Sequence, residues 1–157
     1  MSIPATVTRR KRYILIADIA LGIGVLASAL IAIKGWQFQL LWIPACLVGA
    51  YAVAKLAPLC GMKEKDEDLD EYFLAIRNRA RRSAHNAATI ALGLIVFVIM
   101  LVNAIITRAH LSGESVTDIL TGLANLCACC AIGAHFVFLR SVAGAFNRDE
   151  LISQQVD

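Results

Sequence analysis

The sequence predicts an all-α integral membrane protein, a four-helix bundle of two hairpins joined by a cytoplasmic amphipathic helix. Apolar residues make up 59% of the 157 residues, which is more than the roughly 45–50% found in soluble domains. They gather in four runs, each about as long as the ~20 residues that an α-helix needs to cross a bilayer. One charged segment, residues 59–85, separates the second run from the third.

The first two spans are expected at residues 13–33 and 38–58, and the polar turn between them contains Trp36. The basic segment before the first span, followed by an apolar run, resembles a signal peptide. However, apolar character continues past a pair of small residues, Ala27 and Ala29, and Asp18 interrupts the run. We therefore expect the first span to remain uncleaved.

The third and fourth spans are expected at residues 86–107 and 115–139, on either side of a short loop that contains Gly113. The polar tail, residues 140–157, is expected to fray. A chain of this length has room for one domain, so residues 1–157 are interpreted as a single membrane domain.

Small residues on each span predict close packing between helices, because helix association in lipid relies on short side chains at the contact. On the first span they recur every four positions. The small residues of the four spans are, in order, Ala20, Gly24, Ser28 and Ala32; Ala45 and Gly49; Ala87 and Ala91; and Ala124, Cys127, Ala128 and Ala131.

Positive charge predicts the orientation. Twelve of the fifteen lysines and arginines lie before the first span, in residues 59–85 or in the tail, whereas only Lys34 and Arg108 lie in the two turns. Lysine and arginine in short loops favour the cytoplasmic side. Both termini and the connector (residues 59–85) are therefore expected in the cytoplasm.

The connector is predicted to form a helix from about Leu69 that continues into the third span. Leu69, Phe73 and Ile76 recur at helical spacing, and acids precede arginines, which suits the helix dipole. Asp68 and Glu71 have the spacing of a capping box. The candidate partner surface comprises Asp68, Asp70, Glu71, Arg77, Arg81 and Arg82. The alternative is a positively charged anchor with a solvated acidic loop.

The connector also resembles a known pattern. Asp70-Glu71, Ala75-Ile76-Arg77 and Arg79-Ala80 are similar to the D-E-R-x-x-x-I-x-x-x-A connector of an uncharacterised family of small prokaryotic four-span membrane proteins. Tyr72 stands where that pattern has arginine. The resemblance implies the same two-hairpin architecture and a prokaryotic cytoplasmic membrane, and it implies no activity.

Asp18 is the first candidate for chemistry, because ionisable residues inside a span are costly and often functional. His135 is expected at a similar depth on the fourth span, five residues before Arg140, as Asp18 lies five residues after Tyr13. The two side chains could form a proton-sensitive pair. Alternatively, Asp18 extends toward nearby basic residues or headgroups, and His135 bonds a backbone carbonyl.

Cys127 and Cys130 form a Cys-x-x-Cys on one face of the fourth span. Such a pair suits thiol redox chemistry, as in small four-helix membrane thiol oxidoreductases. Those proteins place their cysteines near the outer surface, however, and burial in the membrane interior disfavours the reactive thiolate. Cysteines that serve as small packing residues are the alternative.

Other sites find no support in the sequence. Asp66, Asp68 and Asp70 alternate as in a calcium loop, but Glu71 and Arg77 stand where that loop needs glycine and glutamate. We expect no cofactor, metal or catalytic motif, and no basic face of the kind that binds nucleic acid.

Three functions follow as hypotheses. The first is a non-enzymatic interaction or regulatory protein that lies in the bilayer and presents its connector to a cytosolic or membrane protein; it could also be an oligomer. The second is a small transporter or proton-responsive protein that uses Asp18 and His135. The third is a membrane thiol oxidoreductase that uses Cys127 and Cys130.

Overall fold

The structure is a computed structural model that describes residues 4–61, 70–109 and 112–156, and this part of the chain is helical apart from short turns. The helices are α1 (Ala5–Lys34), the short 3₁₀ helix η1 (Trp36–Phe38), α2 (Gln39–Leu59), α3 (Glu71–Ala109) and α4 (Gly113–Val156). The four long helices are each long and apolar enough to cross a membrane. The all-α class is therefore confirmed, and the helices fit a multi-pass membrane protein.

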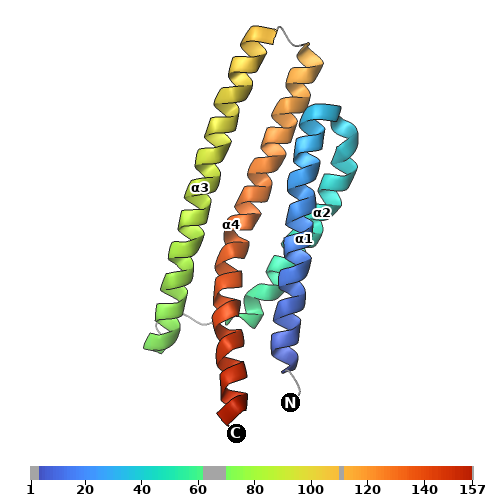
Figure 1. Ribbon diagram of the computed structural model, residues 1–157. Helices are drawn as coiled ribbons and strands as arrows, with labels where there is room; N and C mark the ends of the chain where they lie inside the picture. The colour runs from blue at the N-terminus through green and yellow to red at the C-terminus, as the bar shows by residue number, and fades with distance from the viewer. Residues whose placement is uncertain (1–3, 62–69, 110–111, 157) are drawn as a thin grey trace.

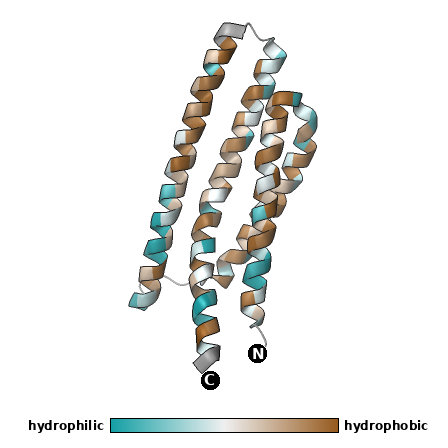
Figure 2. Ribbon diagram, viewed as in Figure 1, coloured by the Kyte–Doolittle hydropathy of each residue, from teal (hydrophilic) through white to brown (hydrophobic). Residues whose placement is uncertain are grey.

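The helices lie side by side, and α4 is the one that all the others contact (Figure 1). α1 packs along both α2 and α4, whereas α3 packs against α4 at the edge of the structure. Both chain ends lie at the same end of the molecule, which we call the inner end. Hydrophilic residues gather on α1, α3 and α4 toward this end (Figure 2).

α3 and α4 both extend well beyond the apolar runs that predicted the third and fourth spans. α3 runs without interruption from Glu71 to Ala109, so the connector helix continues into the third apolar run as expected. The tail, in contrast, was expected to fray, and this was wrong: α4 continues to Val156. The reason is that the tail has an apolar face of its own, because Val142 and Ala143 are buried in the hydrophobic core.

The small residues of α1 are buried as expected, since Ala20, Gly24 and Ser28 all face neighbouring helices. On α4 the expected small face was wrong, because Cys127 and Ala131 are exposed. The residues of α4 that meet α1 and α2 include Gly122, Asn125 and Cys129, which are buried. Spacing alone could not show which side of α4 turns toward α1.

Gly122 marks the closest approach of α4 to α1. A Cβ atom at this position would lie 2.7 Å from the backbone oxygen of Ser28 and 2.8 Å from Cβ of Ala32. Nearby, Asn125 donates a hydrogen bond of 2.7 Å to Oε1 of Gln39 on α2. Asn125 thus bonds across helices. Glycine allows the two backbones to approach closely enough for these contacts.

Arginines from α1 and α3 close the inner end of α2. Arg10 is 8% exposed; its Nε donates to the carbonyl of Leu59 at 2.9 Å and its NH1 donates to Glu150 at 2.8 Å. Arg77, also 8% exposed, donates to the carbonyl of Gly61 at 2.9 Å. The last carbonyl groups of a helix lack partners within the helix, and positive charge is favourable there. These two arginines therefore stabilise the end of α2.

Aromatic residues surround this polar contact. The guanidinium of Arg10 lies 5.4 Å from the ring centre of Phe146 on α4, and the ring of Phe73 on α3 meets Phe146 edge-on at 5.5 Å. At the surface, the Tyr72 hydroxyl donates to Asp149 at 3.1 Å, and that of Thr6 donates to Glu150 at 2.7 Å. All four long helices are thereby connected at the inner end.

A glycine pair on α4 tests this packing. Gly122→Ala should destabilise the protein by about 1–3 kcal/mol, because the added methyl group would overpack the contact with α1. Gly133→Ala is the matched control, since its Cβ would meet nothing within 4 Å and alanine favours a helix. Unfolding in detergent micelles measures both. Equal stability of the two variants would contradict the close approach.

Candidate functional site

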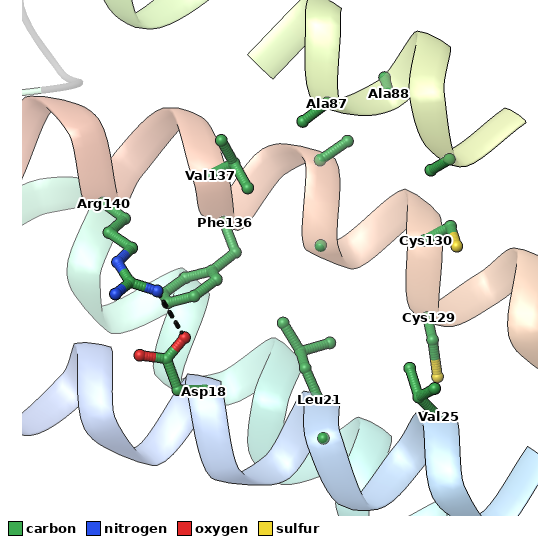
Figure 3. A pocket seen from close by; sticks show the side chains of 14 residues that line it. Asp18, Leu21, Val25, Ala87, Ala88, Cys129, Cys130, Phe136, Val137 and Arg140 are labelled. Atoms are coloured by element: carbon green, nitrogen blue, oxygen red, sulfur yellow. Dashed lines mark hydrogen bonds and ion pairs between the residues drawn. The ribbon is translucent and has the colours of Figure 1, made fainter. Parts of the chain in front are cut away.

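A cavity of about 490 Å³ lies between α1, α3 and α4, along the part of the molecule that is apolar (Figure 3). Its wall on α3 consists of Ala87, Ala88 and Ala91, and small residues such as Gly22 and Gly133 line it elsewhere. These short side chains leave space that larger residues would fill. The cavity is therefore a result of small residues at the place where α3 meets its neighbours.

An ion pair lies in the wall of this cavity. NH1 of Arg140 on α4 donates to Oδ1 of Asp18 on α1 at 2.8 Å, and the two side chains point toward each other (Figure 3). The side chains are 56% and 39% exposed, respectively. In water such an exposed pair contributes little, but a bilayer contains no water to solvate the carboxylate. Pairing with Arg140 lowers the cost of placing Asp18 on a membrane helix.

The structure does not bring Asp18 and His135 together. His135 is exposed, and its ring centre lies 6.4 Å from that of Phe138, one turn along α4. Five residues of a helix correspond to a rotation of about 140° beyond one full turn. His135 and Arg140 therefore point to different sides of α4, and it is Arg140 that faces Asp18. Depth along the helix alone was an insufficient guide to the partner of Asp18.

The cysteines also combine differently from the Cys-x-x-Cys hypothesis. Cys127 is exposed, whereas Cys129 is buried and Cys130 lines the cavity. The closest contact described between two thiols joins α2 to α4, with Sγ of Cys46 and Sγ of Cys129 3.7 Å apart. Gly24 makes room for this contact, because a Cβ atom there would lie 3.0 Å from Cys129 Sγ. Nothing in the spacing of Cys46 and Cys129, 83 residues apart, could have revealed it.

The connector residues divide into two groups. Asp70, Glu71, Arg81 and Arg82 are exposed, and Asp70 accepts a hydrogen bond of 2.8 Å from the backbone N–H of Glu71 at the start of α3. Arg77 is buried instead and bonds the end of α2, so it serves the fold. Asp68, and with it the predicted capping box, lies outside the described residues.

Comparisons with known proteins assign neither a family nor a function to this chain. No family model matches this chain, and neither a curated protein nor a solved structure is significantly similar to it. The resemblance of the connector to small prokaryotic four-span proteins therefore stays a prediction. Among the residues that the structure describes, no three histidine, cysteine or acidic side chains come close enough together to hold a metal ion.

Thiol cross-linking tests the arrangement of α2 and α4. Mild oxidation should join Cys46 to Cys129, because their sulfur atoms need to approach by less than about 2 Å to reach the bonded distance. Peptide mass spectrometry would identify the linked pair. Cys60 should not compete, because its thiol is buried and donates to the backbone carbonyl of Leu139 at 3.7 Å.

Cys130→Ser is the matched control for that measurement and should still give the cross-link, whereas Cys46→Ser and Cys129→Ser should abolish it. A product that links Cys127 to Cys130 in place of Cys46 to Cys129 would contradict the packing of α4 described above.

Proposed function

We propose that this protein is a non-enzymatic multi-pass membrane protein that acts as an interaction or regulatory module. Its four helices form two hairpins in a prokaryotic cytoplasmic membrane, with both termini and the connector in the cytoplasm. The connector, at the start of α3, meets a cytosolic or membrane protein partner. The distribution of basic residues supports this orientation.

The observation that carries this proposal is the anchoring of the connector. Arg77 bonds the carbonyl of Gly61, in the turn after α2, at 2.9 Å, and Phe73 packs against Phe146 of α4. The charged residues around them, Asp70, Glu71 and Arg82, are exposed. The contacts of Arg77 and Phe73 hold this charged surface in place, so it loses little conformational entropy when a partner binds. Preorganisation of this kind favours affinity.

Cross-linking in living cells tests the proposal. A double charge reversal, Asp70→Lys with Glu71→Lys, should reduce the yield of the partner cross-link at least about tenfold, because like charges across an interface are repulsive. The measurement is quantitative mass spectrometry of the product captured by the full-length protein in its own membrane.

Glu114→Lys provides the control, since Glu114 is an exposed acid in the first turn of α4, far from the inner end. It should leave the cross-link unchanged. If both variants reduce the yield equally, or neither does, the connector is not the partner surface. Labelling of the Glu71→Cys variant from outside the cell by a membrane-impermeant thiol reagent would overturn the orientation.

The cavity favours a second candidate function, a small transporter or proton-responsive protein. The carboxylate of Asp18 lines a space of about 490 Å³ and is held by Arg140 alone among the residues that the structure describes. Protonation of Asp18 would release Arg140 and change the polarity of the cavity. This candidate keeps Asp18 from the sequence hypothesis and replaces His135 with Arg140 as its partner.

Proteoliposomes that contain a pH-sensitive dye test this second candidate. Wild-type protein should show a pH-dependent flux, and Asp18→Asn should remove its dependence on pH because the titrating carboxylate is absent. His135→Gln is the control and should retain the dependence. Flux that is unaffected by Asp18→Asn, or that is lost only with His135→Gln, would exclude the ion pair as the responsive element.

A further inference from the structure

A second hollow, distinct from the cavity of Figure 3, lies between the inner parts of α3 and α4. This groove has a volume of about 510 Å³. Its lining residues are Tyr72, Ala75, Ile76 and Arg79 on α3, and Ser141, Ala145, Arg148, Asp149 and Ile152 on α4. None of them lines the first cavity. The alanines provide space, and polar side chains surround them.

The charges in this groove are not balanced internally. Two guanidinium groups and one carboxylate line it, and the carboxylate of Asp149 is already bonded through both oxygens to the hydroxyl of Tyr72, at 3.1 Å each. In the described part of the chain, neither Arg79 nor Arg148 forms an ion pair. The groove therefore presents two arginines, one from each helix, that pair with no carboxylate among the residues that the structure describes.

The groove lies at the level of the other basic residues of the inner end. Asn147, the neighbour of Arg148, accepts a hydrogen bond from Arg10 at 3.4 Å, so Arg148 is level with the basic segment of α1. Arg79 lies seven residues after Tyr72, about 10 Å further toward the apolar part of α3. In a bilayer this region corresponds to the headgroup layer of the leaflet that faces the positively charged end of the protein.

We propose that this groove binds the phosphate headgroup of an anionic phospholipid. Arginine donates paired hydrogen bonds that match the geometry of phosphate oxygens, and Arg79 and Arg148 can approach one phosphate from two sides. The Ser141 hydroxyl is a further donor at the same groove. Basic pockets between membrane helices are suited to anionic headgroups.

A lipid fits the groove better than a soluble phosphate. Ile76 lies between the levels of Arg79 and Arg148 and lines the groove together with two alanines. A headgroup held there would meet apolar side chains as well as guanidinium groups, and its acyl chains would extend past Arg79 toward the apolar part of α3. The carboxylate of Asp149 would repel a peptide with several acidic residues, whereas two guanidinium groups outnumber it in the groove and can hold a single phosphate. The bound lipid would join α3 to α4, and α3 has its main contacts with α4 alone.

Native mass spectrometry of the full-length protein tests the proposal. Protein in micelles is titrated with phosphatidylglycerol, with phosphatidylcholine and with glycerol phosphate. We expect specific retention of phosphatidylglycerol, and Arg79→Gln combined with Arg148→Gln should weaken its binding about 30-fold, since each basic residue near a membrane surface contributes about 1 kcal/mol.

Arg9→Gln combined with Arg12→Gln is the matched control, because it removes the same charge from exposed arginines of α1 that do not line the groove. It should change binding less than about twofold if the site is specific. Circular dichroism should show the same helix content for both double variants. Equal losses in both would show unspecific charge attraction, and equal binding of glycerol phosphate would identify a soluble anion site; either result overturns the proposal.

Discussion

The hydrogen bonds of Arg10 are the contact on which the arrangement of the helices depends most. One guanidinium group connects α1 to the last carbonyls of α2 and to Glu150 of α4. A membrane helix can end only where its free carbonyls find partners. Arg10 supplies such a partner for Leu59, and Arg77 bonds the carbonyl of Gly61 in the turn that follows. α2 can therefore end here, although the helices on both sides of it continue well past this level.

α3 buries fewer apolar side chains against its neighbours than the other three long helices do. Ala80 and Ile95 are its only buried apolar residues in the described part of the chain, because it lies at the edge and packs mainly on α4. Where it faces α4 and α1 its side chains are small, and the cavity and the groove described above result from this. The cavity contains the ion pair of Asp18, and the groove contains two arginines that form no ion pair within the described residues.

The candidate site was predictable only in part. Asp18 was recognisable in the sequence, since a carboxylate in an apolar run is conspicuous wherever its partner lies. Of the two alternatives for Asp18, the structure shows contact with a basic residue, Arg140, and not the pair with His135. The pair with His135 rested on depth along the helix without the angular position of each side chain. Cys46 and Cys129 escaped notice for a similar reason: each is an ordinary small residue until α2 and α4 are placed side by side.

The sequence by itself determined the helical class, the number of apolar helices and the charged end of the molecule, because these follow from local composition and helical period. Only the tertiary structure decided which residues meet. Asp18 and Arg140 are 122 positions apart, and Gly122 allows a close approach that no spacing rule identified. Such contacts depend on how each helix is rotated about its own axis and on which helices are neighbours, and the packing of the whole chain sets both.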